Sequence, residues 1–250
     1  MPTAAPPDLS AQIAERAVRV RERIAAAAER AGRDPADVTL VAVTKTRGLD
    51  TIRAAIEAGL TDLGENRVGE LVEKATAIPG QATAEGGGAV RWHLIGSLQR
   101  NKARDAAAHA DLFHALDSVR LADALDKRAA QAGRVLPVLV QVNVSGEDAK
   151  GGVEPDGAHD LLAYAADAPH LRPVGLMGMA AIAEDDRDLD RVVRPAFRQL
   201  HELFDAWDGR PLVGAGRGGV LSMGMSGDLE VAVEEGATHV RVGTALFGPR

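Results

Sequence analysis

The chain has 250 residues, a formal net charge of -7 and no cysteine. This length is typical of one large domain, and β/α barrels often reach it. The acidic balance argues against nucleic acid as a partner. The absence of cysteine excludes disulfides and thiolate metal sites and suits a reducing compartment. Because neither a secretory signal nor an apolar stretch long enough to cross a membrane is found, we expect a cytoplasmic protein with no membrane partner.

The chain opens on residues 1–9, which are rich in Pro and Ala and are expected to be disordered. Ser10 is a candidate N-cap for a long helix that ends near Ala31. This helix has an apolar face with which it can pack on a larger body. The face is formed by Ile13, Ala17, Val20 and Ile24.

Eight runs with the composition of buried strands then alternate with helical segments. The expected strands are Val38–Thr44, Asp62–Glu65, Arg91–Ile95, Leu112–Ala115, Val135–Val144, Pro173–Met179, Val220–Met225 and Val240–Phe247. The expected helices between them are Leu49–Ala58, Val68–Ala75, Gln99–Ala108, Val119–Ala132, Gly157–Ala166, Leu189–Trp207 and Asp228–Glu235. The Gly-rich segment Gly80–Gly88 is expected to be a flexible surface loop.

Strict alternation of strand and helix predicts parallel strands with right-handed crossovers. Eight such units close into a (β/α)8 TIM barrel. The fold expected for residues 1–250 is therefore one α/β barrel with an extra N-terminal helix. A doubly wound open sheet is the alternative, but no GxGxxG follows the first strand.

Chemistry in β/α barrels lies at the carboxyl ends of the strands, so candidate site residues are sought there. Lys45 directly follows the first strand. An amine at the end of an apolar wall is partly withdrawn from water, which makes it nucleophilic and suits a Schiff base with an aldehyde. The alternative is a surface lysine that merely closes a strand, and position alone favours that alternative.

Two later strand ends offer donors for an anion. Ser226 is a candidate helix N-cap, which would leave free backbone N–H groups at the mouth of the barrel. Gly243 and Thr244 belong to the eighth strand, where a small residue lets backbone amides approach a ligand. Because the loops after strands seven and eight often bind phosphate in such barrels, we predict a phosphate site here.

Arg241 shares a strand face with Gly243, so its guanidinium is expected to point into the barrel. A buried guanidinium requires an acceptor. That acceptor is either a carboxylate such as Glu65 or a ligand atom, and the spacing does not separate the two. His93 and Asn143 are weaker candidates, which either contact a ligand or orient the two cations.

No metal site is predicted, because the seven histidines form no HExxH or similar pair. No GxSxG elbow points to a serine hydrolase. Methionines at the strand ends are expected in the core and the lining of the mouth, where a thioether packs beside a flat ring. They are Met177, Met179, Met223 and Met225.

Seven segments carry a resemblance over nearly the whole chain. They are LVAVTKT (Leu40–Thr46), LGENRVGEL (Leu63–Leu71), WHLIGSLQRNK (Trp92–Lys102), ALDS (Ala115–Ser118), VNVSGEDAKGGV (Asn143–Val153 with the preceding Val), GLMGMA (Gly175–Ala180) and LSMGMSGDLEVAVEEGATHVRVGTALFG (Leu221–Gly248). Together they resemble the pyridoxal 5′-phosphate (PLP) homeostasis protein family, which is similar to the barrel half of alanine racemase.

The resemblance implies a barrel of the alanine racemase N-terminal type that binds PLP. Lys45 matches the lysine that forms the Schiff base, and Arg241 matches the arginine that faces the pyridine nitrogen. Gly227 stands where many relatives carry Asp or Asn, and this glycine would loosen the phosphate turn. Gly151 stands where many relatives carry Ser. The cofactor contacts expected on this basis are Lys45, Asn66, Met223, Ser226, Gly227, Arg241, Gly243 and Thr244.

An arginine at the pyridine nitrogen keeps that atom unprotonated, which makes the ring a poorer electron sink. The related racemases add a tyrosine from a second domain. This chain ends soon after its eighth strand, and its only tyrosine, Tyr164, lies in an expected outer helix. We therefore expect a monomeric carrier or regulator in PLP (vitamin B6) and amino-acid homeostasis, without robust catalysis, which exchanges PLP with apo PLP-dependent enzymes.

Two alternatives remain open. One is weak PLP-dependent amino-acid racemisation, with His93 or water as the second base. The other is a Schiff-base aldolase that uses no PLP.

Overall fold

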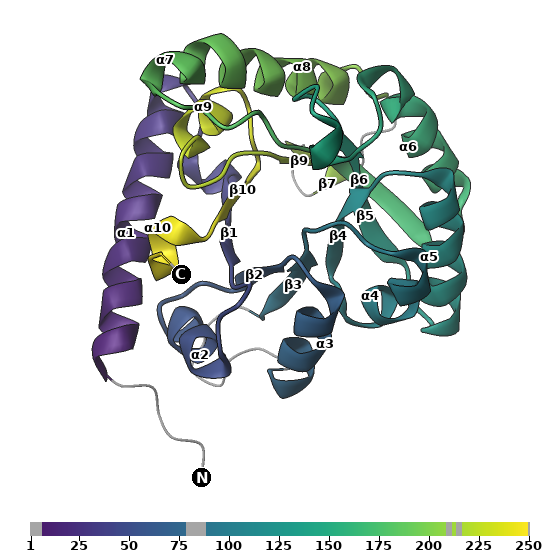
Figure 1. Cartoon of the computed structure of the whole chain (residues 1–250), viewed down its shortest axis with the longest axis horizontal. Coiled ribbons are helices and arrows are strands. Elements are labelled where there is room, and N and C mark those ends of the chain that lie inside the picture. The colour runs from purple at the N-terminus through teal and green to yellow at the C-terminus, as the bar shows by residue number, and fades with distance from the viewer. Residues whose placement is uncertain (1–6, 79–88, 209–211, 214–216, 250) are drawn as a thin grey trace.

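The computed structural model describes residues 7–78, 89–208, 212–213 and 217–249. Its centre is a closed barrel of eight parallel strands, joined in the order β1-β10-β9-β6-β5-β4-β3-β2 (Figure 1). The strands are β1 (Thr39–Val43), β2 (Asp62–Glu65), β3 (Arg91–Leu94), β4 (Leu112–Leu116), β5 (Leu136–Val142), β6 (Leu171–Gly178), β9 (Val220–Ser222) and β10 (His239–Val242). The predicted eight-stranded barrel is confirmed.

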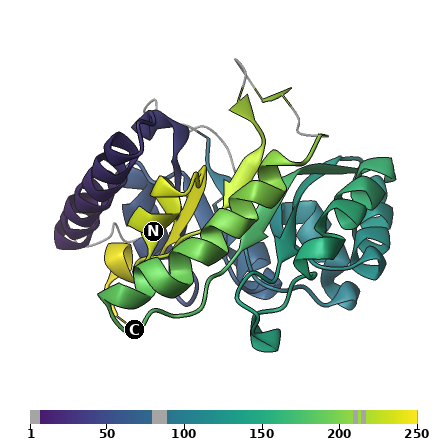
Figure 2. The same ribbon diagram turned by 90° about the horizontal axis from the view of Figure 1, so that it is seen from above.

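Helices connect successive strands and form the outer layer of the barrel (Figures 1 and 2). They are α2 (Leu49–Glu57), α3 (Val68–Ala77), α4 (Ala103–His109), α5 (Val119–Gln131), α6 (Ala158–Asp167), α7 (Asp186–Asp188), α8 (Arg194–Asp205) and α9 (Leu229–Glu234). Alanine, valine and leucine fill the space between strands and helices, and every residue of β4 is buried. Such strands are covered on both faces, as parallel sheets require.

The N-terminal helix α1 (Pro7–Arg30) lies outside the barrel against α2 and α9 (Figures 1 and 2). Its predicted apolar face is buried, with Ile13 and Ala17 fully covered. The helix begins at Pro7, so the expectation that residues 1–9 are disordered is wrong for residues 7–9. Ser10 is likewise inside the helix and not its N-cap, and its hydroxyl donates to Glu57.

The predicted last strand, Val240–Phe247, is wrong in its second half. The strand ends at Val242, and Thr244–Phe247 forms the short helix α10. Its partner β1 ends at Val43, so no further ladder bonds are available to extend it. The Gly-rich segment Gly80–Gly88 lies outside the described residues.

Two smaller features were not predicted. Leu189–Val193, expected as the start of the helix that continues as α8, forms a π-helical turn. A short antiparallel pair, β7 (Leu212–Val213) and β8 (Arg217–Gly218), lies outside the barrel sheet. Within the described ranges, no helix is both long and apolar enough to cross a membrane.

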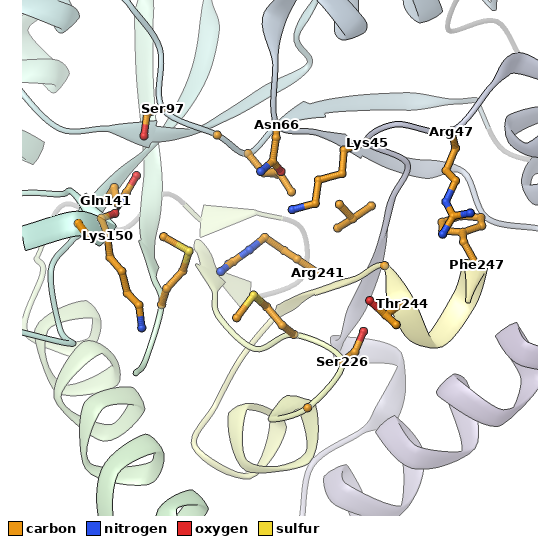
Figure 3. A pocket seen from close by; sticks show the side chains of 18 of the residues that line it. Lys45, Arg47, Asn66, Ser97, Gln141, Lys150, Ser226, Arg241, Thr244 and Phe247 are labelled. Atoms are coloured by element: carbon orange, nitrogen blue, oxygen red, sulfur yellow. Dashed lines mark hydrogen bonds between the residues drawn. The ribbon is translucent and has the colours of Figure 1, made fainter. Parts of the chain in front are cut away.

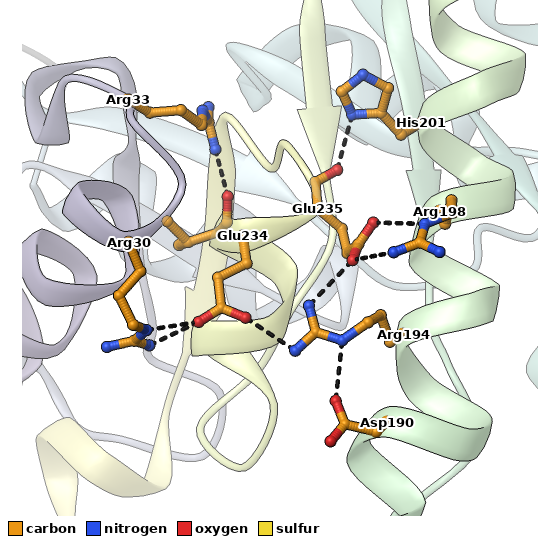
Figure 4. A network of polar contacts seen from close by, with 9 residues as sticks. Arg30, Arg33, Asp190, Arg194, Arg198, His201, Glu234 and Glu235 are labelled. Carbon is orange, nitrogen blue, oxygen red and sulfur yellow. Dashed lines mark hydrogen bonds and ion pairs between the residues drawn. The ribbon is translucent and has the colours of Figure 1, made fainter.

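Arginines bind α1, α8 and α9 together on the outside of the barrel (Figure 4). Arg194 of α8 donates to Glu234 at 2.8 Å and to Glu235 at 3.0 Å, at the end of α9. Glu234 also accepts from Arg30 of α1, and Glu235 from Arg198 of α8. The first helix and two late helices are thus joined by one charged network.

Candidate functional site

A cavity of about 460 Å³ lies at the carboxyl ends of the barrel strands. This volume suits a small organic ligand. Among the described residues that line it there are four cationic side chains and no carboxylate: Lys45, Arg47, Lys150 and Arg241. The cavity is therefore suited to an anionic ligand, although the chain as a whole carries a net negative charge.

Lys45 follows β1 and is half-buried, as the sequence predicts for a lysine at a strand end. In Figure 3 its amine and the guanidinium of Arg241 extend into the same space. The backbone on both sides of Lys45 is held in place. Lys74 Nζ donates to the Thr44 carbonyl at 2.8 Å, and the Thr46 amide donates to Glu70 at 2.7 Å.

Thr46 has a φ of 63°, a left-handed conformation that is uncommon for a residue other than glycine. Backbone strain of this kind persists only where surrounding contacts impose it. The bond from the Thr46 amide to Glu70, and the ion pair of Glu70 with Lys74 at 3.1 Å, supply such contacts. They fix the direction in which Lys45 leaves the strand.

Glu65 is fully buried and its carboxylate lies 2.7 Å from Lys74 Nζ. Burial raises the pKa of Glu65, and the hydrogen bonds from Lys74 and Thr44 act in the opposite direction. Glu65 was one predicted acceptor for Arg241. The structure assigns it to Lys74 instead, so that prediction is wrong.

Arg241 is buried at the base of the cavity, where it donates to Ser222 Oγ at 2.7 Å and to the Gly178 carbonyl at 3.1 Å. Burial lowers the pKa of Arg241 to about 10, opposed by the charge of Asp228. The guanidinium therefore remains charged at neutral pH. Neither of its described acceptors is a carboxylate, which leaves its positive charge available to a ligand.

The predicted anion donors meet on one side of the cavity. Ser226, Gly227, Gly243 and Thr244 all line it, with the Ser226 and Thr244 hydroxyls close together in Figure 3. The Ser226 hydroxyl accepts from the Ala245 amide at 3.3 Å and so ties the loop after β9 to α10. Its predicted role as helix N-cap is wrong, because that position belongs to Asp228.

Asn66 lines the cavity at the end of β2, as predicted, and its backbone lies against Gly96. A Cβ on Gly96 would be 2.2 Å from the Asn66 carbonyl oxygen. Only glycine allows this approach, and the approach holds Asn66 beside Lys45.

Other predicted residues do not reach the cavity. Met223 is fully buried, packs in the core and does not line the cavity, so the structure gives no support to its expected contact with the cofactor, whereas Met179 and Met225 do line the cavity. His93 lies inside the barrel, where it contacts Asp62, and Asn143 is also absent from the lining. Because strand ends alternate in the face they present, position at an end does not show which residues point to the mouth.

Several lining residues were not expected in the site, among them Arg47, Gln141 and Phe247. Arg47 donates to the Gly248 carbonyl at 2.7 Å and stacks over the Phe247 ring at 5.9 Å. Gln141 lies within β5 and donates to the Lys150 carbonyl at 2.7 Å. Arg47 alone had a sequence signal, since it lies two residues beyond Lys45.

Fold and site define a class of protein: a β/α barrel with a lysine at the end of its first strand and cationic side chains lining its mouth. Residues 17–250 match the family described as "Alanine racemase, N-terminal domain". The described part of the chain has no group of three His, Cys, Asp or Glu side chains arranged to hold a metal ion.

The chain is 43% identical over 236 residues to a pyridoxal phosphate homeostasis protein of Aquifex aeolicus, which covers 94% of this chain and 97% of that relative. It is 37% identical over 241 residues to the protein of that name from Escherichia coli K12, with 95% and 97% covered. The structure of PipY from Synechococcus elongatus with PLP bound superposes with a TM-score of 0.75 at 33% identity, covering 94% of this chain and 100% of that one. This chain belongs to the pyridoxal phosphate homeostasis protein family.

Proposed function

We propose that this chain binds PLP in the mouth cavity as a Schiff base on Lys45 and acts as a carrier or regulator of the cofactor. The observation that carries the proposal is the convergence of three groups in one cavity. These are a half-buried amine, a charged arginine, and a cluster of hydroxyl and amide donors.

The donor set fits the chemical groups of PLP. Bound PLP supplies an aldehyde that condenses with amines and a pyridine ring that withdraws electrons. Arg241 has only N–H donors, so it suits an unprotonated pyridine nitrogen. Ser226, Gly227 and Thr244 supply donors suited to a phosphate, and the described residues of the lining include no carboxylate that would repel it.

The lining favours a carrier over a racemase. No tyrosine, histidine or carboxylate is among the described lining residues. The amine of Lys150 donates to the Ala180 carbonyl at 2.6 Å and lies 3.1 Å from Glu147. Tyr164 is on the outer helix α6, where its hydroxyl donates to Asp123. His93, the expected second base of the racemase alternative, does not line the cavity.

The edge of the cavity is open to solvent, because Thr244, Gly227 and Met225 are all exposed. A ligand held there can be reached by small amines from outside. This exposure supports exchange of PLP with apo PLP-dependent enzymes, which would make release as important as binding.

The visible spectrum of the purified protein with added PLP tests the proposal. We expect a Schiff-base band that disappears in Lys45→Ala and is unchanged in Lys102→Ala, a matched control because Lys102 is exposed and outside the cavity. Circular dichroism checks that both variants fold. A band retained by Lys45→Ala would overturn the attachment and direct attention to Lys150.

The carrier role is tested by mixing the PLP-loaded protein with an apo PLP-dependent enzyme. We expect the enzyme to regain activity as the protein loses its band. Robust turnover of a D- or L-amino acid by the pure protein would contradict the carrier role and establish the racemase. Absence of any PLP band in the unaltered protein would instead favour the aldolase without PLP.

A further inference from the structure

A row of buried polar side chains crosses the interior of the barrel below Arg241. Asp62 Oδ1 lies 2.9 Å from His93 Nε2, and His93 Nδ1 lies 2.9 Å from His114 Nε2. His114 Nδ1 lies 3.0 Å from Ser222 Oγ, which also accepts from Arg241 at 2.7 Å. We call Asp62, His93, His114 and Ser222 the polar column.

The polar column joins the two faces of the barrel. Asp62 is the first residue of β2, whereas Arg241 lies towards the carboxyl end of β10 and lines the mouth cavity. His93 borders a second cavity, of about 720 Å³, which is lined by residues at the amino ends of the strands. Barrel interiors are usually filled by branched apolar side chains. A continuous polar row there is expensive unless every group is paired.

The hydrogen bonds in the polar column can be assigned one common direction of donation. Ser222 accepts from Arg241, and we infer that its own proton is donated to its other partner, His114 Nδ1. Burial, the largest cause, keeps the pKa of His114 well below its usual value, so that ring is neutral. A neutral ring that accepts at Nδ1 carries its proton on Nε2, which then donates to His93.

The same rule assigns the next bond. His93 accepts at Nδ1, so its proton is on Nε2 and is donated to Asp62. Burial raises the pKa of Asp62, but hydrogen bonds from His93 and Arg91 outweigh it and hold that pKa below its usual value. A guanidinium at one end and a carboxylate at the other therefore polarise every bond in the same sense.

We propose that the polar column is a positioning device for Arg241: it keeps the guanidinium charged, oriented and donating towards the ring nitrogen of PLP. Ser222 and His114 then contribute to cofactor affinity through Arg241, without touching the cofactor. The proposal rests on the proposed function. The geometry that carries it is the one unbroken series of bonds that ends on the arginine.

A double-mutant cycle between Ser222 and Arg241 tests the proposal. Dissociation constants for PLP are measured by fluorescence titration for the unaltered protein, Ser222→Ala, Arg241→Gln and the double variant. We expect Ser222→Ala to weaken binding about tenfold when Arg241 is present and less than about twofold in the Arg241→Gln background, because contacting residues are energetically coupled. Equal losses in both backgrounds would mean that Ser222 supports only the barrel.

Two histidines extend the test along the polar column. His93→Phe removes a member of the column, whereas His239→Phe alters the neighbouring half-buried ring, 6.1 Å away, whose described side-chain hydrogen bond is to Thr238. We expect weaker PLP binding and a shifted visible spectrum in His93→Phe only. Equal effects of the two substitutions would overturn the positioning role in favour of packing.

Thermal unfolding without PLP separates misfolding from mispositioning. If Ser222→Ala does not fold, Ser222→Cys takes its place in the cycle, because a thiol fills the site with a slightly larger group and is a much weaker hydrogen-bond acceptor. As before, a loss of PLP affinity that depends on Arg241 supports the positioning role, and equal losses in both backgrounds contradict it. Failure of the proposed function has a different signature: the unaltered protein itself would show no Lys45-dependent band.

Discussion

Two glycines at the mouth of the barrel have opposite surroundings. A Cβ on Gly96 would be 2.2 Å from the Asn66 carbonyl oxygen and 2.9 Å from its carbonyl carbon. A Cβ on Gly227 would meet no atom within 4 Å, and Gly227 is not in the left-handed region. A side chain at Gly227 would therefore meet no steric obstacle, whereas Gly96 is required for the position of Asn66.

We expect Gly96→Ala to lower the free energy of unfolding by about 1–3 kcal/mol and to weaken PLP binding, because the connections after β2 and β3 must separate. Gly227→Ala is the matched control. It should raise the free energy of unfolding by up to about 1 kcal/mol through reduced freedom of the unfolded chain. Urea denaturation of both variants measures this, and equal stability of the two would refute the close approach at Gly96.

At this scale the sequence predicts residues whose position is fixed by a strand end, such as Lys45 and Arg241. It does not predict contacts that depend on how neighbouring strands are staggered. Met223 and Met225 are two residues apart in the sequence, and both were expected in the core and the lining of the mouth. The strand ends at Ser222, so the alternation of faces does not continue to them, and Met223 is buried while Met225 is exposed.

At the scale of elements, helix α3 supports the end of β1. Lys74, on α3, is buried and contacts the Thr44 carbonyl, Glu65 and Glu70. It therefore neutralises a fully buried carboxylate and holds the backbone beside Lys45. This role cannot be predicted from the sequence, because a lysine in the middle of an amphipathic helix ordinarily lies in solvent.

We expect Lys74→Met to lower the free energy of unfolding by about 3–5 kcal/mol at neutral pH, since it leaves Glu65 buried without its partner. The substitution raises the pKa of Glu65 further in the folded state only. A carboxyl whose pKa is higher in the folded than in the unfolded state makes the protein less stable as pH rises through that folded pKa. The difference in the free energy of unfolding between Lys74→Met and the unaltered protein should therefore be largest at pH 7 and shrink as pH approaches about 4.

Denaturant unfolding at several pH values checks this, and Glu65→Gln in the Lys74→Met background supplies the control. The double variant should recover most of the loss, because the buried group is then neutral. A deficit that is independent of pH would show that Lys74 acts through packing alone.

Elements with regular alternation were predicted within a few residues, β1 and α2 among them. The end of β10 was not, because VGTALF reads equally well as a strand or as a helical turn. Its conformation depends on where β1 stops, far away in the sequence. The start of α1 was missed for a local reason, because its first turn contains a proline, which helices accept at that position.

At the scale of the whole molecule, the charged network of Figure 4 joins α1 to α8 and α9. Burial opposes ionisation of Glu234 and Glu235, but the bonds from Arg194 and its neighbours lower the pKa of both carboxyls. The side chain of Arg194 is only 26% exposed, so its ion pairs are partly protected from solvent.

We expect Arg194→Met to lower the free energy of unfolding by about 1–2 kcal/mol at pH 7, the upper range for a partly buried network. A carboxyl whose pKa is lowered by folding stabilises the folded protein at pH values above its unfolded pKa of about 4.3. This stabilisation is lost as pH falls through the pKa of the folded state. The deficit should therefore vanish towards pH 3. Arg191→Met, which breaks an ion pair whose arginine is 80% exposed, should change stability by less than about 0.5 kcal/mol. Equal deficits in the two variants would contradict a stabilising network.

The pairing of β1 with β10 brings Val41 beside Arg241, so the first and last strands of the barrel are neighbours in space. A ligand that contacts both Lys45 and Arg241 therefore bridges the seam at which the barrel closes. During synthesis, a growing polypeptide has its lysine long before it has its arginine and the turn at Gly243. Only a completed barrel holds both, and a ligand that binds it shifts the equilibrium towards the closed form by mass action. A ligand bound in the mouth would thus be found only on chains whose synthesis and barrel closure are both complete.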